Sequence, residues 1–351
     1  MKLGKNLDKL FDKGRKFFED IGSCSQLTLI YDKDVDGCIS AAIAIKALEK
    51  MGVCPYKVVS YDIQELGEIL KSVRKSDRAI ILDLGIYSIK KELKKLNKYI
   101  VVVDHHPPTA LDKKIILINP RLANPNVYQP ASYVCYNFFS TIVSMQEHEW
   151  LAVVGSIGDY AYEDCRDLLD KYVSVGKKEE LKKTEYGRAA DILNGAAAIG
   201  GFERCLDILL RAEGVRDVLK NRELVRNYQK YELALSRSEK EFWRNLQKYD
   251  DAGLWLSVIE SKMFRIGSTL TTKISTEYPE KIIILLDRVG DVYRLHARYQ
   301  TGRVHMGELM KKLANGGGHD RAAGGEIKVK ELENFKRELI KELANFPGKR
   351  S

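Results

Sequence analysis

Short apolar runs alternate with helix-like stretches over the first 160 residues of the chain. The runs are rich in β-branched residues and almost continuously apolar, which is the pattern of strands that are buried on both faces. They lie at 26–31, 56–61, 78–84, 99–104 and 114–119. Helical stretches accompany them at 37–51, 64–75, 88–96, 131–145 and 149–163. The alternation predicts an α/β domain with a parallel sheet and helices on both of its faces.

The pattern changes near residue 205. Residues 206–250 are charged, favour helix and contain no proline, so we expect a helical connector there. Strand-like runs then follow at 254–261, 281–287 and 291–299, with helical stretches near 267–277, 305–314 and 330–344. The sequence therefore predicts three parts: a first domain over 1–205, the connector over 206–250, and a smaller α/β domain over 251–351.

Composition is typical of a soluble globular chain. The 351 residues suffice for two domains, and 44% of them are hydrophobic against 30% charged. No run approaches the roughly 20 apolar residues of a membrane span, and the charged N-terminal sequence lacks the apolar core of a secretory signal. The six cysteines have neither disulfide nor zinc spacing. We expect reduced thiols and a cytoplasmic location.

The chain carries a moderate positive charge. Its 58 lysines and arginines against 49 acids give a formal charge of +9. This balance favours a polyanionic partner, although a solvated surface of lysine and glutamate explains it equally well.

Three aspartates crowd the end of the first predicted strand, in the sequence YDKDVDG over 31–37. Side chains two apart on an extended strand share a face, so Asp32, Asp34 and Asp36 are expected to converge on a cation. Gly37 permits a sharp turn into the next helix. A calcium loop of the helix–loop–helix type is excluded, because its twelfth position, here Ile43, would have to be glutamate.

Acids and histidines also follow other strands of the predicted sheet. Asp83 ends one run, and Asp104, His105 and His106 end another, while Asp159 follows a small-residue apolar stretch. A single aspartate at such a place is most often a helix cap. Because the carboxyl ends of parallel strands meet at one edge, the set together predicts a site for two divalent ions. Imidazole among carboxylates favours manganese, or iron or cobalt, over magnesium.

These motifs resemble those of the DHH phosphoesterase superfamily, which is named for the tripeptide found here at 104–106. The family's four N-terminal motifs have counterparts in order: DKDVDG, LDLG, VVVDHHPP and SIGDYA. The sequence NGGGHDRAAGG over 315–325 is similar to the signature of the accessory DHHA1 domain. The variant DxDxDG resembles the RecJ branch of single-strand exonucleases and its archaeal relatives.

The resemblance implies roles for individual residues. It implies these metal ligands: Asp34, Asp36, Asp83, His105 and Asp159. Asp83 would bridge the two ions, and Asp32 would be a ligand or a neighbouring acid. Asp104 would orient the adjacent imidazole, and His106 would contact the scissile phosphate or assist the leaving group. The substrate-binding residues implied in the second domain are Gly316, Gly317, Gly318, His319 and Arg298, with Arg294 a weaker match.

The function that the resemblance implies is a manganese-dependent exonuclease on single-stranded DNA or RNA, with magnesium or cobalt as substitute ions. A role in DNA repair, with a replication or repair protein as partner, accompanies it. The alternative is a hydrolase of short oligoribonucleotides, 3′-phosphoadenosine 5′-phosphate or cyclic dinucleotides. The sequence ends 32 residues after His319, where full RecJ exonucleases continue, and this favours the alternative. The intact carboxylates argue against a purely structural role.

Overall fold

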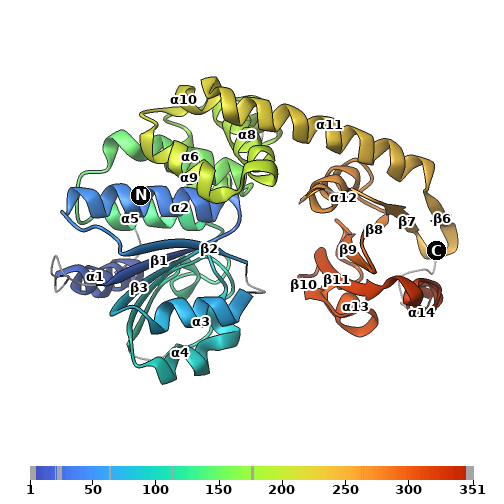
Figure 1. Cartoon of the computed structure of the whole chain (residues 1–351), viewed down its shortest axis with the longest axis horizontal. Helices are drawn as coiled ribbons and strands as arrows, with labels where there is room; N and C mark the ends of the chain where they lie inside the picture. Colours follow the sequence, from blue (N-terminus) through green and yellow to red (C-terminus); the bar gives the residue numbers. More distant parts are fainter. Residues whose placement is uncertain are drawn as a thin grey trace. The chain divides into compact units, whose positions relative to one another are not determined.

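The protein is described from a computed structural model that covers residues 5–19, 21, 26–62, 65–111, 114–174, 178–261, 263 and 265–344. The chain divides into two compact units, Met1–Tyr228 and Gln229–Ser351. The division falls inside a long helix, α11 (Arg222–Arg244), so a continuous helix leads from one unit into the other (Figure 1). No helix among the described residues is long and apolar enough to cross a membrane.

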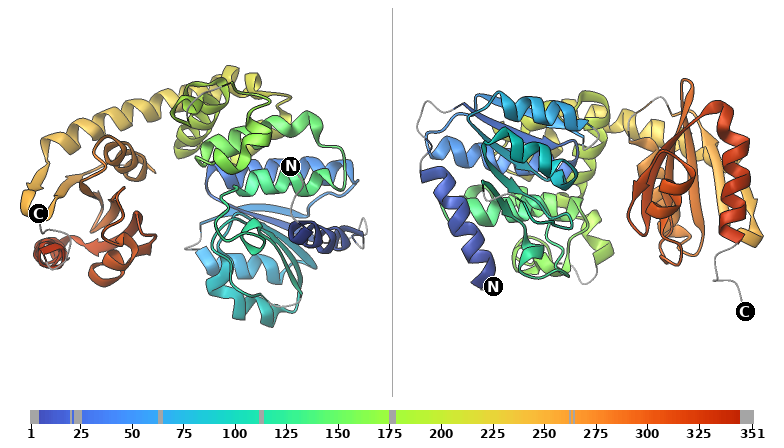
Figure 2. Two further views of the ribbon diagram at one scale, coloured as in Figure 1. Left: turned by 180° about the vertical axis from the view of Figure 1, so that it is seen from behind. Right: turned by 90° about the horizontal axis from the view of Figure 1, so that it is seen from below.

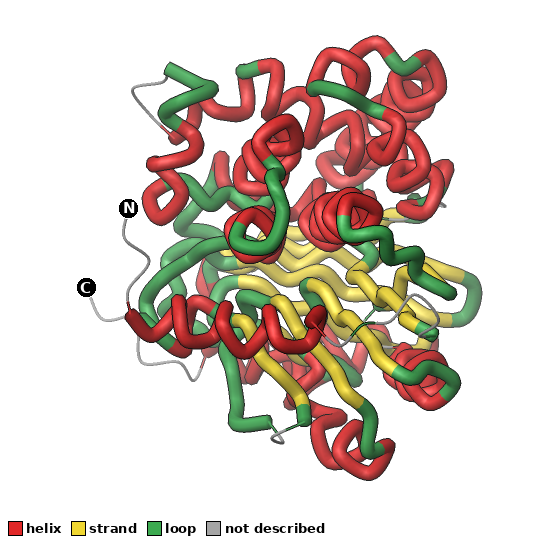
Figure 3. Tube along the Cα trace, turned by 90° about the vertical axis from the view of Figure 1, so that its left-hand side faces the viewer, coloured by secondary structure: helices red, strands yellow, loops and turns green. Residues whose placement is uncertain are grey.

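A five-stranded parallel sheet forms the centre of the first unit (Figure 3, strands in yellow). Its strands run in the order β2-β1-β3-β4-β5. They are β1 (Leu27–Asp32), β2 (Lys57–Tyr61), β3 (Arg78–Leu82), β4 (Tyr99–Val103) and β5 (Ile115–Ile118). All four pairings are parallel, which confirms the predicted α/β class.

Both faces of this sheet are covered, as the continuous apolar runs predicted. Leu29 and Tyr31 point to one apolar cluster, whereas Ile30 between them belongs to the other. The first cluster packs under α2 (Val35–Lys50) and α5 (Ala131–Ser140). The second packs against α3 (Leu66–Arg74) and α4 (Lys90–Leu96), on the opposite side of the sheet (Figure 1).

Helix α2 is buried almost around its whole circumference, which explains its composition of alanine, isoleucine and glycine. One side lies on β1, and the other sides pack against α5, α6 (Glu149–Gly158), α8 (Glu185–Gly200) and α9 (Phe202–Arg211). Two short helices, α7 (Arg166–Leu169) and α10 (Val215–Lys220), belong to the same unit. The first unit therefore has a helical layer above the layer that covers the sheet (Figure 2).

The second unit contains a mixed sheet in the order β10-β11-β9-β8-β7-β6. Its strands are β6 (Gln247–Tyr249), β7 (Leu254–Ile259), β8 (Ile282–Val289), β9 (Val292–Arg298), β10 (Gly317–Gly318) and β11 (Ala322–Lys328). Only β7 and β8 run parallel within it. Helix α12 (Ile266–Glu277) packs on β8 and β9, and α13 (Met306–Leu313) and α14 (Leu332–Ala344) contribute to the apolar cluster of this unit.

Three elements differ from those expected. An N-terminal helix, α1 (Lys5–Glu19), was not predicted, because its many charges obscure the buried Phe11, Phe17 and Phe18. The helix expected over 131–145 ends at Ser140. The residues expected to form one helical connector contain the end of α9, then α10 and α11, and finally the strand β6.

Replacing Phe138 with alanine should lower the free energy of unfolding by about 3–5 kcal/mol, because its fully buried ring contacts Phe11, Phe18 and Phe139. Urea denaturation followed by circular dichroism measures the change. Tyr56, of which 67% is exposed, provides the control: Tyr56→Ala should change stability by less than about 0.5 kcal/mol. Equal losses in the two variants would contradict the assigned core.

Candidate metal centre

The carboxyl edge of the parallel sheet collects the predicted acids and histidines. Asp32 is the last residue of β1, and Asp83 directly follows β3, which pairs with β1. Asp104, His105 and His106 directly follow β4, the next strand along the sheet. The neighbouring strand ends therefore bring these side chains to one place, as parallel topology requires.

The three aspartates of the first motif do not lie on one extended strand, and that expectation was wrong. Strand β1 ends at Asp32, Asp34 is the N-cap of α2, and Asp36 lies in the first turn of that helix. The Asp34 carboxylate accepts a hydrogen bond from the Gly37 amide at 2.8 Å. A Cβ atom on Gly37 would lie 2.5 Å from the Asp32 carbonyl oxygen, so the turn requires glycine.

Asp159 reaches the same place from a helix. It is the C-cap of α6, and its carboxylate oxygen Oδ2 lies 3.7 Å from His105 Nδ1. The other nitrogen of His105, Nε2, lies 3.3 Å from Asp83 Oδ1. His105 thus stands between two carboxylates that come from different elements.

The potential ligand atoms fall into three overlapping groups, and the atoms of each group lie within 4.8 Å of one another. The groups are Asp32, Asp34 and Asp83; Asp36, His105 and Asp159; and Asp83, His105 and His106. Asp83 and His105 each belong to two groups, so the three sets form one continuous cluster. Asp83 Oδ1 and His105 Nδ1 are buried and have no hydrogen-bond partner among the described residues, so each could donate a lone pair to a cation. The residues present therefore fit divalent metal ions.

Electrostatics gives a second reason for a cation. Burial, reinforced by the neighbouring carboxylates, raises the pKa of Asp83 and of Asp36 well above the usual value. The same causes raise the pKa of Asp32 to about 8. Burial, together with the charge of Asp34, raises the pKa of Asp159 to about 7, against the hydrogen bond from Tyr128. Divalent cations would reverse these shifts, because positive charge favours the ionised carboxylates.

Backbone strain accompanies the charge. Asp83 has a φ of 60°, a left-handed conformation that residues other than glycine seldom adopt. Tyr160, which follows Asp159, has a φ of 57°. Strained residues of this kind concentrate at functional sites, where the surrounding structure holds them in place.

The two adjacent histidines are tuned in opposite directions. Burial, with the neighbouring His106 charge, lowers the pKa of His105 to about 4, so its imidazole is neutral at pH 7. Burial alone would lower the pKa of His106 as well, but the hydrogen bond and charge of Asp104 outweigh it and raise that pKa to about 9. His105 can therefore offer a lone pair, whereas His106 carries a proton on both nitrogens.

Asp104 pairs with His106 rather than with the adjacent His105, which differs from the role expected for it. The fully buried Asp104 accepts a hydrogen bond from His106 Nδ1 at 2.7 Å and another from the Tyr87 hydroxyl at 2.5 Å. Asn119 donates to the Tyr87 hydroxyl at 3.2 Å and to the His106 carbonyl at 2.9 Å.

Tyr87 and Asn119 were not among the residues that the sequence singled out. The only sequence signal was their place: Asn119 follows the apolar run of β5, and Tyr87 lies four residues after Asp83. Together with Asp104 they form a buried polar network under His106, which fixes the orientation of its ring.

Asp36 also has a structural role. Its two carboxylate oxygens accept hydrogen bonds from the amides of Ala131 at 2.7 Å and Ser132 at 3.0 Å, at the start of α5. The capping role that a single aspartate most often has is thus present here, in addition to its place in the ligand cluster. Asp36 therefore joins the first turn of α2 to α5 beneath the candidate site.

Tyr128 contacts two members of the cluster, Asp159 and His105. Its hydroxyl donates to Asp159 Oδ2 at 2.7 Å, and its ring centroid is 5.5 Å from that of His105. The side chain thus holds one of the candidate ligands without being one itself.

The residues predicted to bind substrate in the second unit gather at one end of its sheet. Arg298, the last residue of β9, pairs in register with Ala322 of β11. The His319 amide donates to the Ala322 carbonyl at 2.8 Å, so His319 and Arg298 flank the same residue. The glycines at 316–318 lead into this point, and Gly317 and Gly318 form the short strand β10. His319 is exposed.

Arg298 is held by hydroxyl groups. Its guanidinium donates to Ser268 Oγ at 3.1 Å and Thr272 Oγ1 at 3.3 Å, both on α12, and to the Ala297 carbonyl at 3.0 Å. Its neighbour Arg294 pairs in register with Glu326 of β11. A half-buried arginine held by neutral groups retains its positive charge for an anion.

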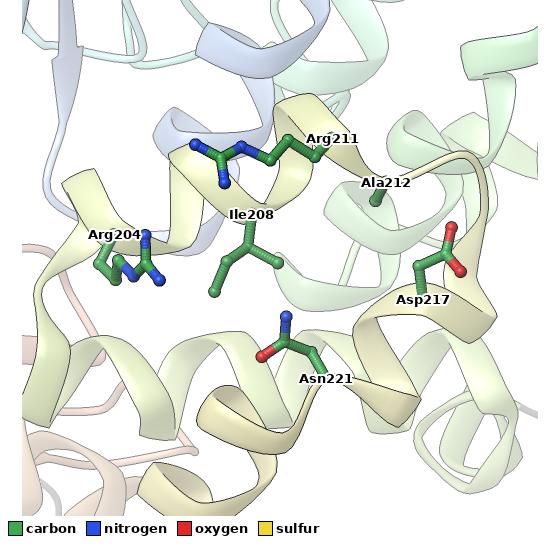
Figure 4. A pocket seen from close by; sticks show the side chains of 6 residues that line it. All are labelled: Arg204, Ile208, Arg211, Ala212, Asp217 and Asn221. Atoms are coloured by element: carbon green, nitrogen blue, oxygen red, sulfur yellow. The ribbon is translucent and has the colours of Figure 1, made fainter.

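A surface hollow elsewhere in the first unit contains none of these residues. It is lined by Arg204, Ile208, Arg211, Ala212, Asp217 and Asn221 (Figure 4). Arg204 already forms a two-pronged ion pair with Glu223, and Asp217 and Asn221 accept hydrogen bonds from backbone amides at nearby helix starts. Its polar groups thus stabilise α9, α10 and α11.

Family models match both units. The DHH family, N-terminal domain, matches residues 26–155, and the DHHA1 domain matches residues 264–345. The chain belongs to the DHH family. A search of curated proteins found no match.

Solved structures share this fold. The chain is similar to RecJ in complex with Mn²⁺ from Thermus thermophilus, with 19% identity, a TM-score of 0.73, and coverage of 98% of this chain and 55% of that one. It is similar to an exonuclease RecJ bound to manganese, with 19% identity, a TM-score of 0.71, and coverage of 96% and 95%. The pGpG-specific phosphodiesterase PggH from Vibrio cholerae follows at 17% identity, a TM-score of 0.54, and coverage of 91% and 99%. The chain thus spans about half the length of the Thermus RecJ.

Replacing Asp83 or His105, which each belong to two of the three groups, should weaken metal binding without unfolding the chain. Loss of a residue that only hydrogen-bonds to a metal ligand typically lowers metal affinity by roughly 10–100-fold. Asp83→Asn and His105→Ala should each lower manganese affinity by more than that. Asp83→Asn should also raise the melting temperature of the metal-free protein, because it removes one member of a set of repelling carboxylates. Titration calorimetry and thermal unfolding measure both effects, with exposed Asp170→Asn as the unchanged control.

The pH dependence has a definite sign. Since Asp32 and Asp159 have folded pKa values of about 8 and 7, above those of the unfolded chain, the metal-free fold binds extra protons and loses stability as pH rises from 4 to 8. Manganese must displace these protons, so its affinity and its effect on the melting temperature should grow from pH 6 to pH 8. A larger manganese effect at pH 6 than at pH 8 would contradict the cluster.

Proposed function

We propose that this DHH protein is a two-metal-ion, manganese-dependent phosphodiesterase that hydrolyses single-stranded DNA or RNA from an end. The observation that carries the proposal is the cluster of three overlapping ligand groups around Asp83 and His105. Its mixture of carboxylates with imidazole suits manganese better than magnesium. The fold likeness to RecJ structures that contain manganese or magnesium supports a divalent ion, and the ligand set favours manganese.

We propose that the ligands are those that the family resemblance implied: Asp34, Asp36, Asp83, His105 and Asp159. Asp32 is an additional ligand or a neighbouring acid. Asp83 is suited to bridge two ions, because it belongs to two of the three groups and has a buried oxygen that accepts no hydrogen bond from any described residue. When bound, such ions lower the pKa of water and neutralise charge on a phosphate.

His106 is the proposed catalytic side chain of the protein. Asp104 keeps it protonated at neutral pH, so its free N–H can donate to a phosphate oxygen or to the leaving oxygen. Asp104 itself acts as a positioning residue, since its oxygens are engaged by His106 and Tyr87. Neutral His105 beside it remains available as a ligand.

The second unit is the proposed substrate-binding domain. Arg298, with His319 and the glycines at 316–318, is suited to hold a phosphate of the terminal nucleotide, because its guanidinium donates to two hydroxyl groups and a carbonyl group, which are all neutral. The exposed His319 can donate to the same anion. Binding of one chain end in this way would favour stepwise removal of nucleotides over internal cleavage.

A second function has its own support. The likeness to a pGpG-specific phosphodiesterase, which covers nearly all of that protein, favours a hydrolase of short oligoribonucleotides or related small substrates, including 3′-phosphoadenosine 5′-phosphate and cyclic dinucleotides. The match to the Thermus RecJ covers 55% of that protein. The charge of +9 favours the longer polyanion.

We also propose a role for each domain and a cellular process for the enzyme. Residues 1–205 would form the catalytic domain, 206–250 the connector and 251–351 the substrate domain. The protein would act in the cytoplasm in DNA repair, alongside a replication or repair protein.

A digestion experiment separates these functions. End-labelled single-stranded DNA and RNA, labelled at either end and ranging from two to about 30 nucleotides, are incubated with manganese or with a chelator. Stepwise shortening from one end, in manganese alone, is the expected result. Asp83→Asn should reduce the rate by at least about 10³-fold, whereas Asp170→Asn should cleave like the wild type.

Two results would redirect the assignment. Cleavage confined to substrates of a few nucleotides would favour the short-substrate hydrolase. Cleavage of circular single strands at a comparable rate would contradict action from an end, and unchanged activity in Asp83→Asn would contradict the metal centre.

A further inference from the structure

Arg121 stands at the carboxyl edge of the parallel sheet, in a position that none of the sequence motifs includes. It belongs to a short 3-10 turn, Pro120–Leu122, that begins two residues after β5 ends. Strand β5 pairs with β4, whose end carries Asp104, His105 and His106. The topology thus brings one arginine to the edge that holds the acidic cluster.

The backbone at Arg121 is connected to the polar network under His106. The Arg121 amide donates to Asn119 Oδ1 at 3.0 Å. The amide nitrogen of the same Asn119 side chain donates to the His106 carbonyl and to the Tyr87 hydroxyl. The fully buried Asn119 therefore holds the backbone of Arg121 and the backbone of the proposed catalytic histidine, His106.

The charge of Arg121 acts on the metal centre. It lowers the pKa of His105, in the same direction as the larger effects of burial and of His106, and it lowers the pKa of Tyr87 against the larger raising effect of burial. In spite of the many carboxylates at this edge, Arg121 forms no ion pair with any described acid.

The guanidinium of Arg121 has a donor group without an acceptor. Its Nε atom is buried and has no hydrogen-bond partner within the described part of the chain. A buried guanidinium N–H without an acceptor is costly, and an anion supplied by a ligand would satisfy it. An arginine with a purely structural role would instead be expected to pair with one of the nearby carboxylates or carbonyl groups.

We propose that Arg121 binds a non-bridging oxygen of the phosphate that is cleaved, and so acts as a catalytic residue in addition to the metal ligands and His106. The inference rests on the proposed function of the site as a phosphodiesterase. A planar guanidinium suits this task, because two of its N–H groups can meet two oxygens of one phosphate. Its charge would stabilise negative charge that increases on those oxygens in the transition state.

The test uses the full chain with manganese and three probes: bis(p-nitrophenyl) phosphate, which contains a single diester, a 5′-phosphorylated trinucleotide, and inorganic phosphate. Arg121→Ala should lower kcat/KM by about 10²-fold or more on both diesters alike, which is the scale of losing one preorganised donor. It should also weaken binding of inorganic phosphate to the manganese-loaded protein. Guanidinium chloride should restore part of its activity, and Arg121→Lys should retain an intermediate rate.

Matched measurements separate this role from a structural one. Manganese affinity and melting temperature should be unchanged in Arg121→Ala, and Arg216→Ala, a change at an exposed arginine, should leave every quantity unchanged. Activity of Arg121→Ala within about twofold of wild type would overturn the inference. So would a parallel loss of manganese affinity, or a loss confined to the trinucleotide, since the arginine would then hold the metal centre or a neighbouring phosphate instead.

The outcome for Arg121 can be distinguished from the outcome for the proposed function. If the wild type and Arg216→Ala hydrolyse neither diester in manganese, the phosphodiesterase assignment fails. Arg121 is then judged by phosphate binding alone: equal affinities in wild type and Arg121→Ala overturn its role, and a clear loss in the variant supports an anion site there.

Discussion

Mutual repulsion among buried carboxylates is the constraint on which the rest of this site depends. Asp36 and Asp83 are buried beside Asp32, Asp34 and Asp159, and burial, together with the charge of neighbouring carboxylates, raises the pKa values of four of these groups. Folding tolerates this cost because the apolar sheet beneath supplies the stability. The charge is concentrated beyond the carboxyl ends of the parallel strands, where ligands bind in sheets of this kind.

The surrounding network divides the roles of two adjacent residues. His105 and His106 have the same side chain and neighbouring positions, yet Asp104 makes one of them cationic while the other stays neutral. Tyr87 and Asn119 hold Asp104 and the backbone of His106 in turn. A neutral and a cationic imidazole thus stand side by side, because Asp104 is hydrogen-bonded to the ring of His106.

Much of the fold was predictable because the local pattern carries it. Continuous apolar runs at β1, β3, β4 and β5 identify strands covered on both faces, and each observed strand lies within about one residue of its predicted range. Helix α1 was missed, because charged residues dominate its sequence. Its phenylalanines are recognised as core residues only from their packing against α5. Strands β10 and β11 gave no strand signal in the sequence, because they consist largely of glycine and alanine and contain few β-branched residues.

The sequence by itself determined which residues could carry chemistry, since aspartates and histidines after apolar runs must meet when those runs pair in parallel. Tertiary structure alone decided how they meet. Asp36 turned out to lie in a helix, and Asp104 turned out to pair with His106. Those outcomes depend on side-chain direction, burial and neighbours far apart in the chain, which are set by packing in three dimensions and have no counterpart in residue spacing.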